Sequence, residues 1–367
     1  MDRFTGQIYF YRVFDVASAI DLAMASERLS NIAEAKPFKL RKTSRAMVIE
    51  EAPVALSMGG WEQEIGGRHY PVTAYGKLWG FGALSINLCI NIQNAISFNE
   101  LLTMAQLLSN EDTFHELAVE RCKLLTKDLG KAVIKGSELS EFYEDYLIFN
   151  MDAQGMKNEQ VDALLKSDII HQLILTEKET NLSNQMRENI QSNVFQYSKD
   201  DFVILDWNSA FICSEGDGAD IADVIEFGLC QMMEMRYYDD LLDRKLSGLY
   251  RDIQTIESST FSRRYAKLAQ EAALMYIEIS QVVERIENSM KVIGDFYYAK
   301  IFRQALNRFR FSDWRQSVDQ KLKNLADVSG MFMGEVNAKR SHLMEMIVIV
   351  LISVEVVTFL VRLVSNL

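Results

Sequence analysis

The chain has 367 residues, of which 49% are hydrophobic and 25% are charged, so wholesale disorder is excluded and two domains can be accommodated. The net charge of −12 excludes broad coating of a nucleic acid, although it is compatible with a local basic patch. The four cysteines are widely spaced, which favours reduced thiols over a disulfide framework or a zinc site.

The three prolines all lie within the first 71 residues. Because proline interrupts helices, the rest of the chain is free to form long ones. We therefore predict an α+β soluble body at 1–215, a connecting helix packed on that body at 216–260, a helical coiled-coil hairpin at 261–340, and a transmembrane tail anchor at 341–367.

The predicted body alternates strand-like and helix-like segments, which indicates a mixed sheet covered by helices. The strand-like segments are Gln7–Arg12, Ala46–Leu56, Tyr70–Ile92, Tyr146–Asn150 and Phe202–Cys213. The helix-like segments are Ala17–Ala33, Ser97–Leu108 and Thr113–Val133. Gly80 and Gly82 interrupt the third strand-like segment, where we expect a bend and not a phosphate-binding loop, because no helix follows.

The run Lys36–Arg45 carries five positive charges and no acid. It suits either contact with a polyanion or a solvated connecting loop, and the loop is the favoured interpretation.

The segment Phe202–Leu246 predicts a strand, a turn rich in glycine and aspartate, and a long helix that Asp217 or Asp220 can cap. Two interpretations of its acidic residues are open. One gathers the carboxylates of Asp206, Glu226, Glu234 and Asp239 into a metal or catalytic site. The other makes them caps and ion pairs that tie the helix to the sheet. We favour the second, because no histidine accompanies them and no known ligand spacing appears, and we predict no metal and no cofactor.

Apolar residues recur every three or four positions from Tyr265 to Phe296 and again from Val318 to Val336. Such seams predict packed helices. Residues 308–313 break the register between them, and Ser312 or Asp313 can cap a new helix. An antiparallel hairpin within the chain and a parallel coiled coil between chains both remain open.

The expected hairpin tip, Lys291–Lys323, has eight basic and three acidic residues interleaved with aromatic ones. This pattern suits a phosphate-rich partner such as structured RNA, or ordinary helix packing with a solvated face, which is the favoured interpretation. The candidate partner-binding residues are Arg303, Arg308, Arg310, Trp314, Arg315 and Lys321.

The run Met346–Val361 has 13 apolar residues out of 16, and with its flanks it is long enough to span a bilayer as one helix. A central carboxylate, Glu355, costs roughly 2.5–3.5 kcal/mol, less than the roughly 4–8 kcal/mol that the apolar residues contribute. A buried helix in a soluble bundle is the alternative. Glu345 and Glu355 are candidate helix-interface residues, and pairing at Glu355 would join chains into an oligomer in the bilayer.

The charges around this helix predict its orientation. Lys339 and Arg340 precede it and only Arg362 follows, which favours a cytoplasmic body. Arg12 and Asp15 interrupt any signal-peptide apolar region, so we expect the body to stay where it is made.

Two stretches together resemble a known family. The first is Phe202–Asp243, with Glu226-Phe227 and the run Glu234–Asp239 followed by Leu242-Asp243. The second is Met344–Ile349 with Glu355-Val356. In order and spacing they are similar to the Required for Meiotic Nuclear Division family, over roughly residues 140–363. Met346 stands where that family tends to place tryptophan. The motif residues that the resemblance singles out are Asp206, Glu226, Glu234, Arg236, Tyr238, Asp239 and Asp243.

The resemblance implies a membrane-anchored scaffold without established catalytic chemistry, and eukaryotic members are associated with mitochondrial translation. Asp2 and Asp15 argue against a transit peptide, so we expect a bacterial cytoplasmic membrane. The leading hypothesis is thus an anchored, oligomeric scaffold that binds the ribosome or RNA, with no small-molecule substrate. The alternative is a membrane-tethered, metal-dependent enzyme that uses the carboxylates between Asp206 and Asp239.

Overall fold

The computed structural model describes residues 3–29, 36–37, 52–110, 112–136, 142–152, 158–165, 167–176, 183–196, 198, 201–214, 218–254, 261–289 and 296–365. Contacts divide the chain into two units. The first comprises Met1–Tyr237 with Val282–Arg315, and the second comprises Tyr238–Gln281 with Gln316–Leu367. Three long helices contribute residues to both units, namely α7 (Gly218–Gln254), α8 (Phe261–Ser289) and α10 (Phe311–Ser365).

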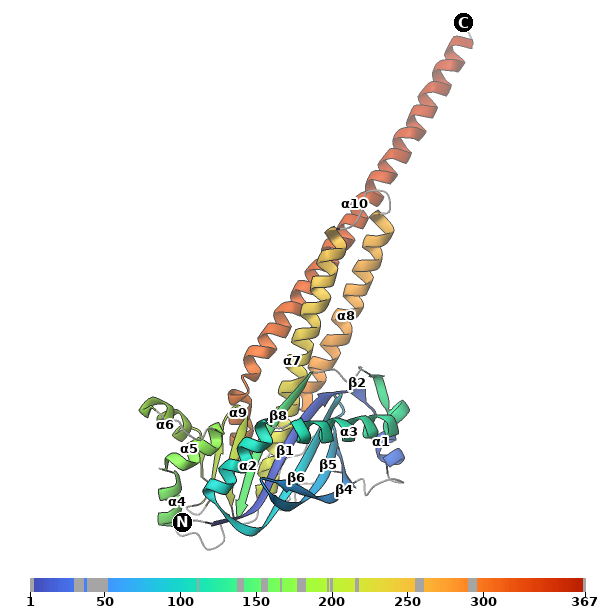
Figure 1. Ribbon diagram of the computed structural model, residues 1–367. Helices are drawn as coiled ribbons and strands as arrows, with labels where there is room; N and C mark the ends of the chain where they lie inside the picture. Colours follow the sequence, from blue (N-terminus) through green and yellow to red (C-terminus); the bar gives the residue numbers. More distant parts are fainter. Residues whose placement is uncertain are drawn as a thin grey trace. The chain divides into compact units, whose positions relative to one another are not determined.

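The first unit is built on a mixed sheet that has nine strands within the described residues (Figure 1). Their order is β3 (Lys36–Pro37), β4 (Val54–Ile65), β5 (Arg68–Leu78), β6 (Ala83–Ser97), β1 (Arg3–Asp15), β8 (Tyr143–Asp152), β11 (Ser209–Ser214), β10 (Phe202–Leu205) and β9 (Val194–Phe195). Neighbouring strands pair antiparallel, apart from β8 and β11, which pair in parallel. A separate pair is formed by β2 (Ala17–Ile20) and β7 (Val133–Gly136).

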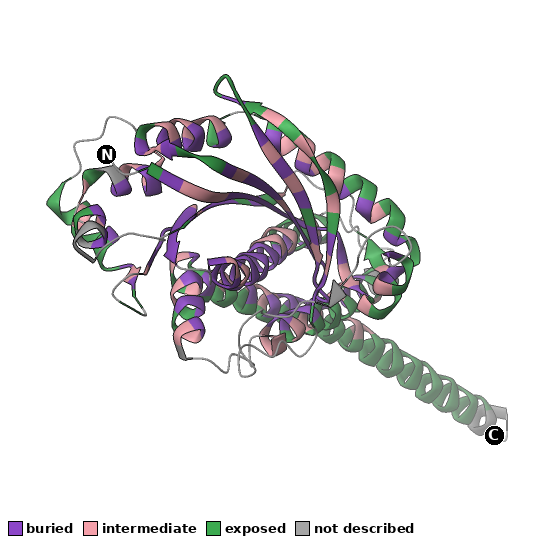
Figure 2. Cartoon of the chain, turned by 90° about the horizontal axis from the view of Figure 1, so that it is seen from below, coloured by how far each residue is buried: buried purple, intermediate pink, exposed green. Residues whose placement is uncertain are grey.

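Side chains of β1 alternate between the two faces of this sheet, as the period of two in a strand requires. Ile8, Phe10 and Phe14 belong to the apolar core, to which α2 (Phe98–Asn110) and α3 (Asp112–Leu129) contribute their buried faces. The remaining short helices are α1 (Leu22–Leu29), η1 (Gly130–Ala132), α4 (Asn158–Leu165), α5 (Asp168–Leu175), α6 (Asn184–Gln191) and α9 (Phe296–Arg308). Figure 2 shows strands that are largely buried along their middles.

The opposite face of the sheet is covered by the first part of α7. The Trp79 indole stacks on the Phe227 ring with centroids 5.0 Å apart, and Phe227 in turn stacks on Phe302 of α9 at 5.3 Å. The first unit is therefore layered, with α2 and α3 on one face of the sheet and the start of α7 with α9 on the other.

The predicted α+β class is confirmed, and most predicted elements of the body are found. The predicted helix Ala17–Ala33 is wrong in its first part, because Ala17–Ile20 pairs with β7 as a strand and the helix begins only at Leu22. The bend at Gly80–Gly82 is confirmed: Gly82 has a φ of +112°, and a Cβ there would lie 1.8 Å from the Ala17 carbonyl oxygen. Residues 46–51 and 38–45 lie outside the described residues.

The second unit packs three helix segments together, from α7, α8 and α10. The Tyr265 and Phe332 rings lie 5.3 Å apart, and the Ser329 hydroxyl donates to the Ala269 carbonyl at 3.0 Å. Residues of both predicted seams are buried, among them Leu268, Ala272, Ile279, Val318, Leu322, Leu325 and Phe332. The sequence did not predict that α7 would join them as a third helix.

The helix break predicted at residues 308–313 is confirmed, since α9 ends at Arg308 and α10 begins at Phe311, with a φ of +54° at Arg310. Among the described residues, the preceding stretch contains two helices: α8 ends at Ser289 and α9 starts at Phe296.

Candidate functional site

The C-terminal part of α10 is an apolar helix that the other described residues leave uncovered (Figure 2). Its most apolar 18-residue window has a mean hydropathy of 2.5 and is 0% buried. Leu351, Val357 and Phe359 are 63%, 58% and 64% exposed. Within the described part of the chain, α10 is the one helix that is long and apolar enough to cross a membrane.

The polar groups of this apolar stretch are mostly satisfied locally. The Ser353 hydroxyl donates to the Ile349 carbonyl at 2.7 Å, and the Thr358 hydroxyl lies 3.0 and 2.8 Å from the carbonyls of Val354 and Glu355. Such bonds let a hydroxyl enter hydrocarbon without an unpaired donor. Glu345 pairs with His342 at 3.4 Å, whereas the Glu355 carboxyl has no partner among the described side chains.

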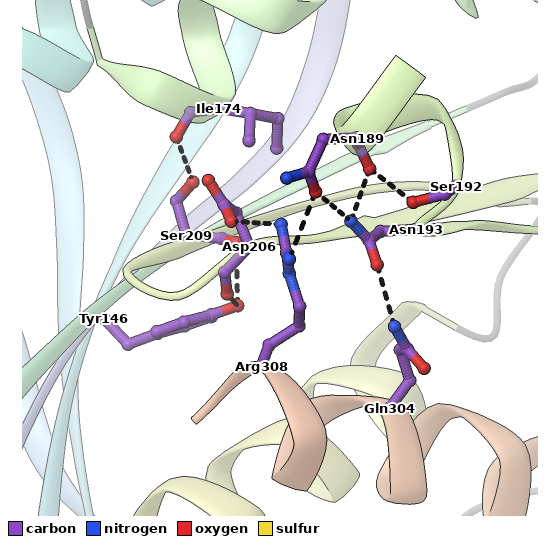
Figure 3. A network of polar contacts seen from close by, with 9 residues as sticks. All are labelled: Tyr146, Ile174, Asn189, Ser192, Asn193, Asp206, Ser209, Gln304 and Arg308. Carbon is purple, nitrogen blue, oxygen red and sulfur yellow. Dashed lines mark hydrogen bonds and ion pairs between the residues drawn. The ribbon is translucent and has the colours of Figure 1, made fainter. Parts of the chain in front are cut away.

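Two sets of candidate residues meet in one ion pair, between Asp206 and Arg308 (Figure 3). Arg308 Nη2 lies 2.7 Å from Asp206 Oδ1, and the two side chains are only 24% and 7% exposed. Burial raises the pKa of Asp206, and the guanidinium opposes that rise. The predicted catalytic carboxylate and the predicted partner-binding arginine are therefore each other's partner.

A polar network holds this pair in place (Figure 3). The Tyr146 hydroxyl lies 2.8 and 2.7 Å from the carbonyl oxygens of Asp206 and Ser209, and the Ser209 hydroxyl donates to the Ile174 carbonyl at 2.6 Å. Arg308 Nη1 also donates to Asn189 Oδ1 at 3.3 Å. The network fixes the short turn between β10 and β11 and the end of α9 against it.

The same turn presents a residue that sequence reasoning missed. Trp207 follows Asp206 and is 67% exposed, although its neighbours in β10 and β11 are buried. The sequence does contain a signal for this residue. Asp206 and Asn208 interrupt two apolar runs on either side of Trp207, which predicts a turn with an exposed tip.

Most of the other basic candidates are also occupied within the chain. Arg310 pairs with Asp313 at 2.8 Å, and Arg315 Nε lies 2.6 Å from Glu287. Lys321 Nζ lies 2.7 Å from Asp239 and 2.6 Å from Asp243. Trp314 is covered by the Arg236 guanidinium, 5.3 Å from its ring centroid. Arg303 is exposed, and its Nε donates to Ala299 of its own helix at 3.2 Å.

The remaining acidic candidates have separate surroundings. Glu226 is buried and pairs with Lys77, which also pairs with Asp223. Burial alone would lower the pKa of Lys77. The carboxylates of Asp223 and Glu226 raise this pKa by more than burial lowers it, so the net shift is upward. The structure thus places Glu226 in an ion pair between the sheet and α7.

Arg236 pairs with Glu144, and burial raises the pKa of that carboxyl to about 7 despite the guanidinium. Glu234 is completely buried, and neither carboxylate oxygen has a hydrogen-bond partner in the described part of the chain. Burial raises its pKa well above the ordinary value, and the charge of Asp15 adds to the rise. Tyr238 is buried on the same helix.

The four carboxylates of the metal-site interpretation are therefore not brought together. Asp206 contacts α9, Glu226 contacts β5, Glu234 lies near Asp15, and Asp239 contacts Lys321 and accepts from Ser317 at 2.5 Å. Among the described residues, no group of three histidine, cysteine or acidic side chains is placed to hold a metal ion.

The fold and these contacts define an α+β sheet protein that carries one long apolar helix. A family model described as the N-terminal domain of the uncharacterized protein MJ0711 matches residues 5–220, and the chain belongs to this family. The uncharacterized protein MJ0711 of Methanocaldococcus jannaschii is 23% identical over 240 residues, which cover 65% of this chain and 72% of that relative. No solved structure matches the chain.

This family match overturns the resemblance to the Required for Meiotic Nuclear Division family, which was wrong. The two motifs that carried that resemblance are short and are made mostly of acidic and apolar residues. Any amphipathic helix followed by an apolar helix supplies such patterns, so they did not identify the family.

Proposed function

We propose that the chain is a single-pass membrane protein that holds its sheet body at the membrane surface as a scaffold for a macromolecular partner. The observation that carries the proposal is the uncovered apolar end of α10. From Leu343 to Val361 the helix is ~28 Å long, close to the ~30 Å of a hydrocarbon core. An apolar surface of this extent is unstable in water, and lipid is the cover that its length fits.

The orientation follows from the flanking charges. Lys339 and Arg340 precede the apolar segment, and basic residues are retained preferentially on the cytoplasmic side. We propose that the body lies on that side.

For the partner, we propose the ribosome or an RNA. Two features of the first unit support this choice. Trp207 is exposed at a rigid turn, where an indole can stack on a base, and α9 carries the exposed basic residues Lys300 and Arg303 and no acidic residue. A scaffold is favoured over an enzyme, because the candidate carboxylates occupy separate contacts.

The partner is tested by purifying the full chain from membranes and sequencing the RNA and protein that accompany it. Trp207→Ala combined with Arg303→Glu should reduce the captured RNA at least tenfold. Lys323→Glu, which removes an exposed charge on α10, is the matched control and should leave capture unchanged. If the wild type, the double variant and the Lys323→Glu control captured equal amounts of RNA, Trp207 and Arg303 would not belong to the partner-binding surface.

A further inference from the structure

The helix α10 has an exposed side that differs in composition from the side that it buries. In the second unit it buries Val318, Leu322, Leu325 and Phe332. At 3.6 residues per turn, a second line of residues lies on the far side of the helix. Its members are seven apart in two series, Gly330, Asn337, Met344 and Leu351, and Gly334, Ser341, Val348 and Glu355, and all are exposed. We call this line the α10 seam.

The two glycines of the α10 seam have no evident role within a single chain. A Cβ added at Gly330 or Gly334 would meet no atom within 4 Å, and neither residue has a positive φ. Glycine is disfavoured in a helix interior compared with alanine, so its use here needs a reason. Met331 and Met333 flank the glycines and are 56% and 46% exposed. Small residues between apolar ones are typical of a place where a second helix approaches closely.

The far end of the α10 seam gives an independent reason for a partner. Glu355 lies in the apolar stretch, where an isolated carboxylate is costly. Ser353 and Thr358 use their hydroxyls on the backbone of their own helix, and no described side chain pairs with Glu355. Lipid hydrocarbon has no group that can hydrogen-bond to this carboxyl, whereas a second carboxyl at the same depth can.

We propose that a second copy of this chain pairs with α10 in parallel along the α10 seam. The inference rests on the proposed membrane anchorage: two copies anchored from the same side run α10 in the same direction. A two-fold axis along the membrane normal then brings identical residues together. The spacing of seven keeps the α10 seam in contact through a left-handed crossing of ~20°. The two Glu355 side chains then meet at the same depth, where their carboxyl groups hydrogen-bond to each other.

The α10 seam also has the features that specify register. Asn337, Ser341 and Glu355 are its polar members, and a polar residue at a seam position pairs best with its own counterpart. A second copy of the chain supplies the same polar residues at the same positions, and no other component is needed. We therefore assign a second copy as the partner that covers the α10 seam.

Cysteine cross-linking of the full chain in lipid vesicles tests the pairing. The four native cysteines are buried, so an added cysteine is the accessible thiol. Ser341→Cys is nearly isosteric and lies on the α10 seam, and we expect it to form a disulfide-linked dimer on mild oxidation. Leu343→Cys is exposed two residues further on, about 200° around the helix, and should form at least tenfold less dimer.

Four further variants separate pairing from folding. Gly334→Leu adds bulk where a single chain has open space, so the chain should fold while Ser341→Cys cross-linking falls at least tenfold. Glu335→Leu places the same bulk about 100° away and should leave cross-linking intact. Glu355→Gln should retain the dimer, because paired amides also hydrogen-bond, whereas Glu355→Leu should weaken it about tenfold.

Flotation of the vesicles is scored in the same samples. Inserted chains that do not cross-link at position 341, that cross-link equally at 341 and 343, or that are unaffected by Gly334→Leu would overturn the pairing alone. Chains that fail to float would overturn both the anchorage and the pairing that rests on it.

Discussion

The Asp206–Arg308 pair gives the sharpest prediction about stability. Replacing Arg308 with alanine removes the cation that pairs with Asp206. The Asp206 side chain is only 7% exposed, so water does not replace that cation. The backbone N–H of Trp207 still supports the carboxylate, and burial still raises the pKa of Asp206. Arg308→Ala should therefore destabilise the folded chain, mainly through an unpaired buried charge.

The expected loss is about 3 kcal/mol. Breaking a buried ion pair by removing one partner costs roughly 3–5 kcal/mol, and we take the lower end because the Arg308 side chain is 24% exposed. Without Arg308 the pKa of Asp206 rises further. The loss should be largest at pH 7 and shrink as the pH falls, because the folded variant then takes up a proton at Asp206 and no longer holds an unpaired charge.

The assay is urea unfolding of the full chain in mild detergent, followed by circular dichroism at pH 4.5 and pH 7. Arg303→Ala is the matched control on the same helix, and it should change the free energy of unfolding by less than about 0.5 kcal/mol. A loss below about 1 kcal/mol for Arg308→Ala, the size typical of exposed pairs, would refute the reasoning.

Two other predictions concern the core. Gly82→Ala should cost at least about 2 kcal/mol, because its φ is +112° and the Cβ would meet the Ala17 carbonyl at 1.8 Å. Gly59→Ala, with a φ of +88° in open space, should cost about half as much in the same urea assay; equal losses would contradict the clash. In the wild type, the contribution of Glu234 to stability should fall as the pH rises above about 4.5, because burial raises the pKa of Glu234 and folding must keep it protonated. The advantage of Glu234→Gln in thermal unfolding should therefore grow from pH 5 to pH 8, and a constant advantage would refute this.

The sequence predicted elements whose cause is local. The apolar periodicity of α2, α3 and α8 and the short strand-like run in β1 depend on neighbouring residues, so each was visible in a short window. The glycine bend at Gly82 was predicted for the same reason. The strand β2 was missed because Ala17–Ile20 is a strand only through its pairing with β7, more than a hundred residues away.

The candidate site was harder to predict, because its contacts are distant in the chain. Asp206 and Arg308 are 102 residues apart, and Lys77 and Glu226 are 149 apart. A single sequence shows such residues as unpaired charges, so Asp206 was considered for catalysis and Arg308 for partner binding. Only the fold shows that they neutralise each other. The apolar end of α10 was predictable, because its signal lies in composition alone.

Membrane anchorage is tested most directly by flotation of the full chain and of a chain ending at Arg340, each mixed with lipid vesicles and washed with carbonate and high salt. We predict that the full chain floats with the lipid through both washes and that the shortened chain stays in the soluble fraction. Flotation of both chains, or of neither, would contradict α10 as the anchor.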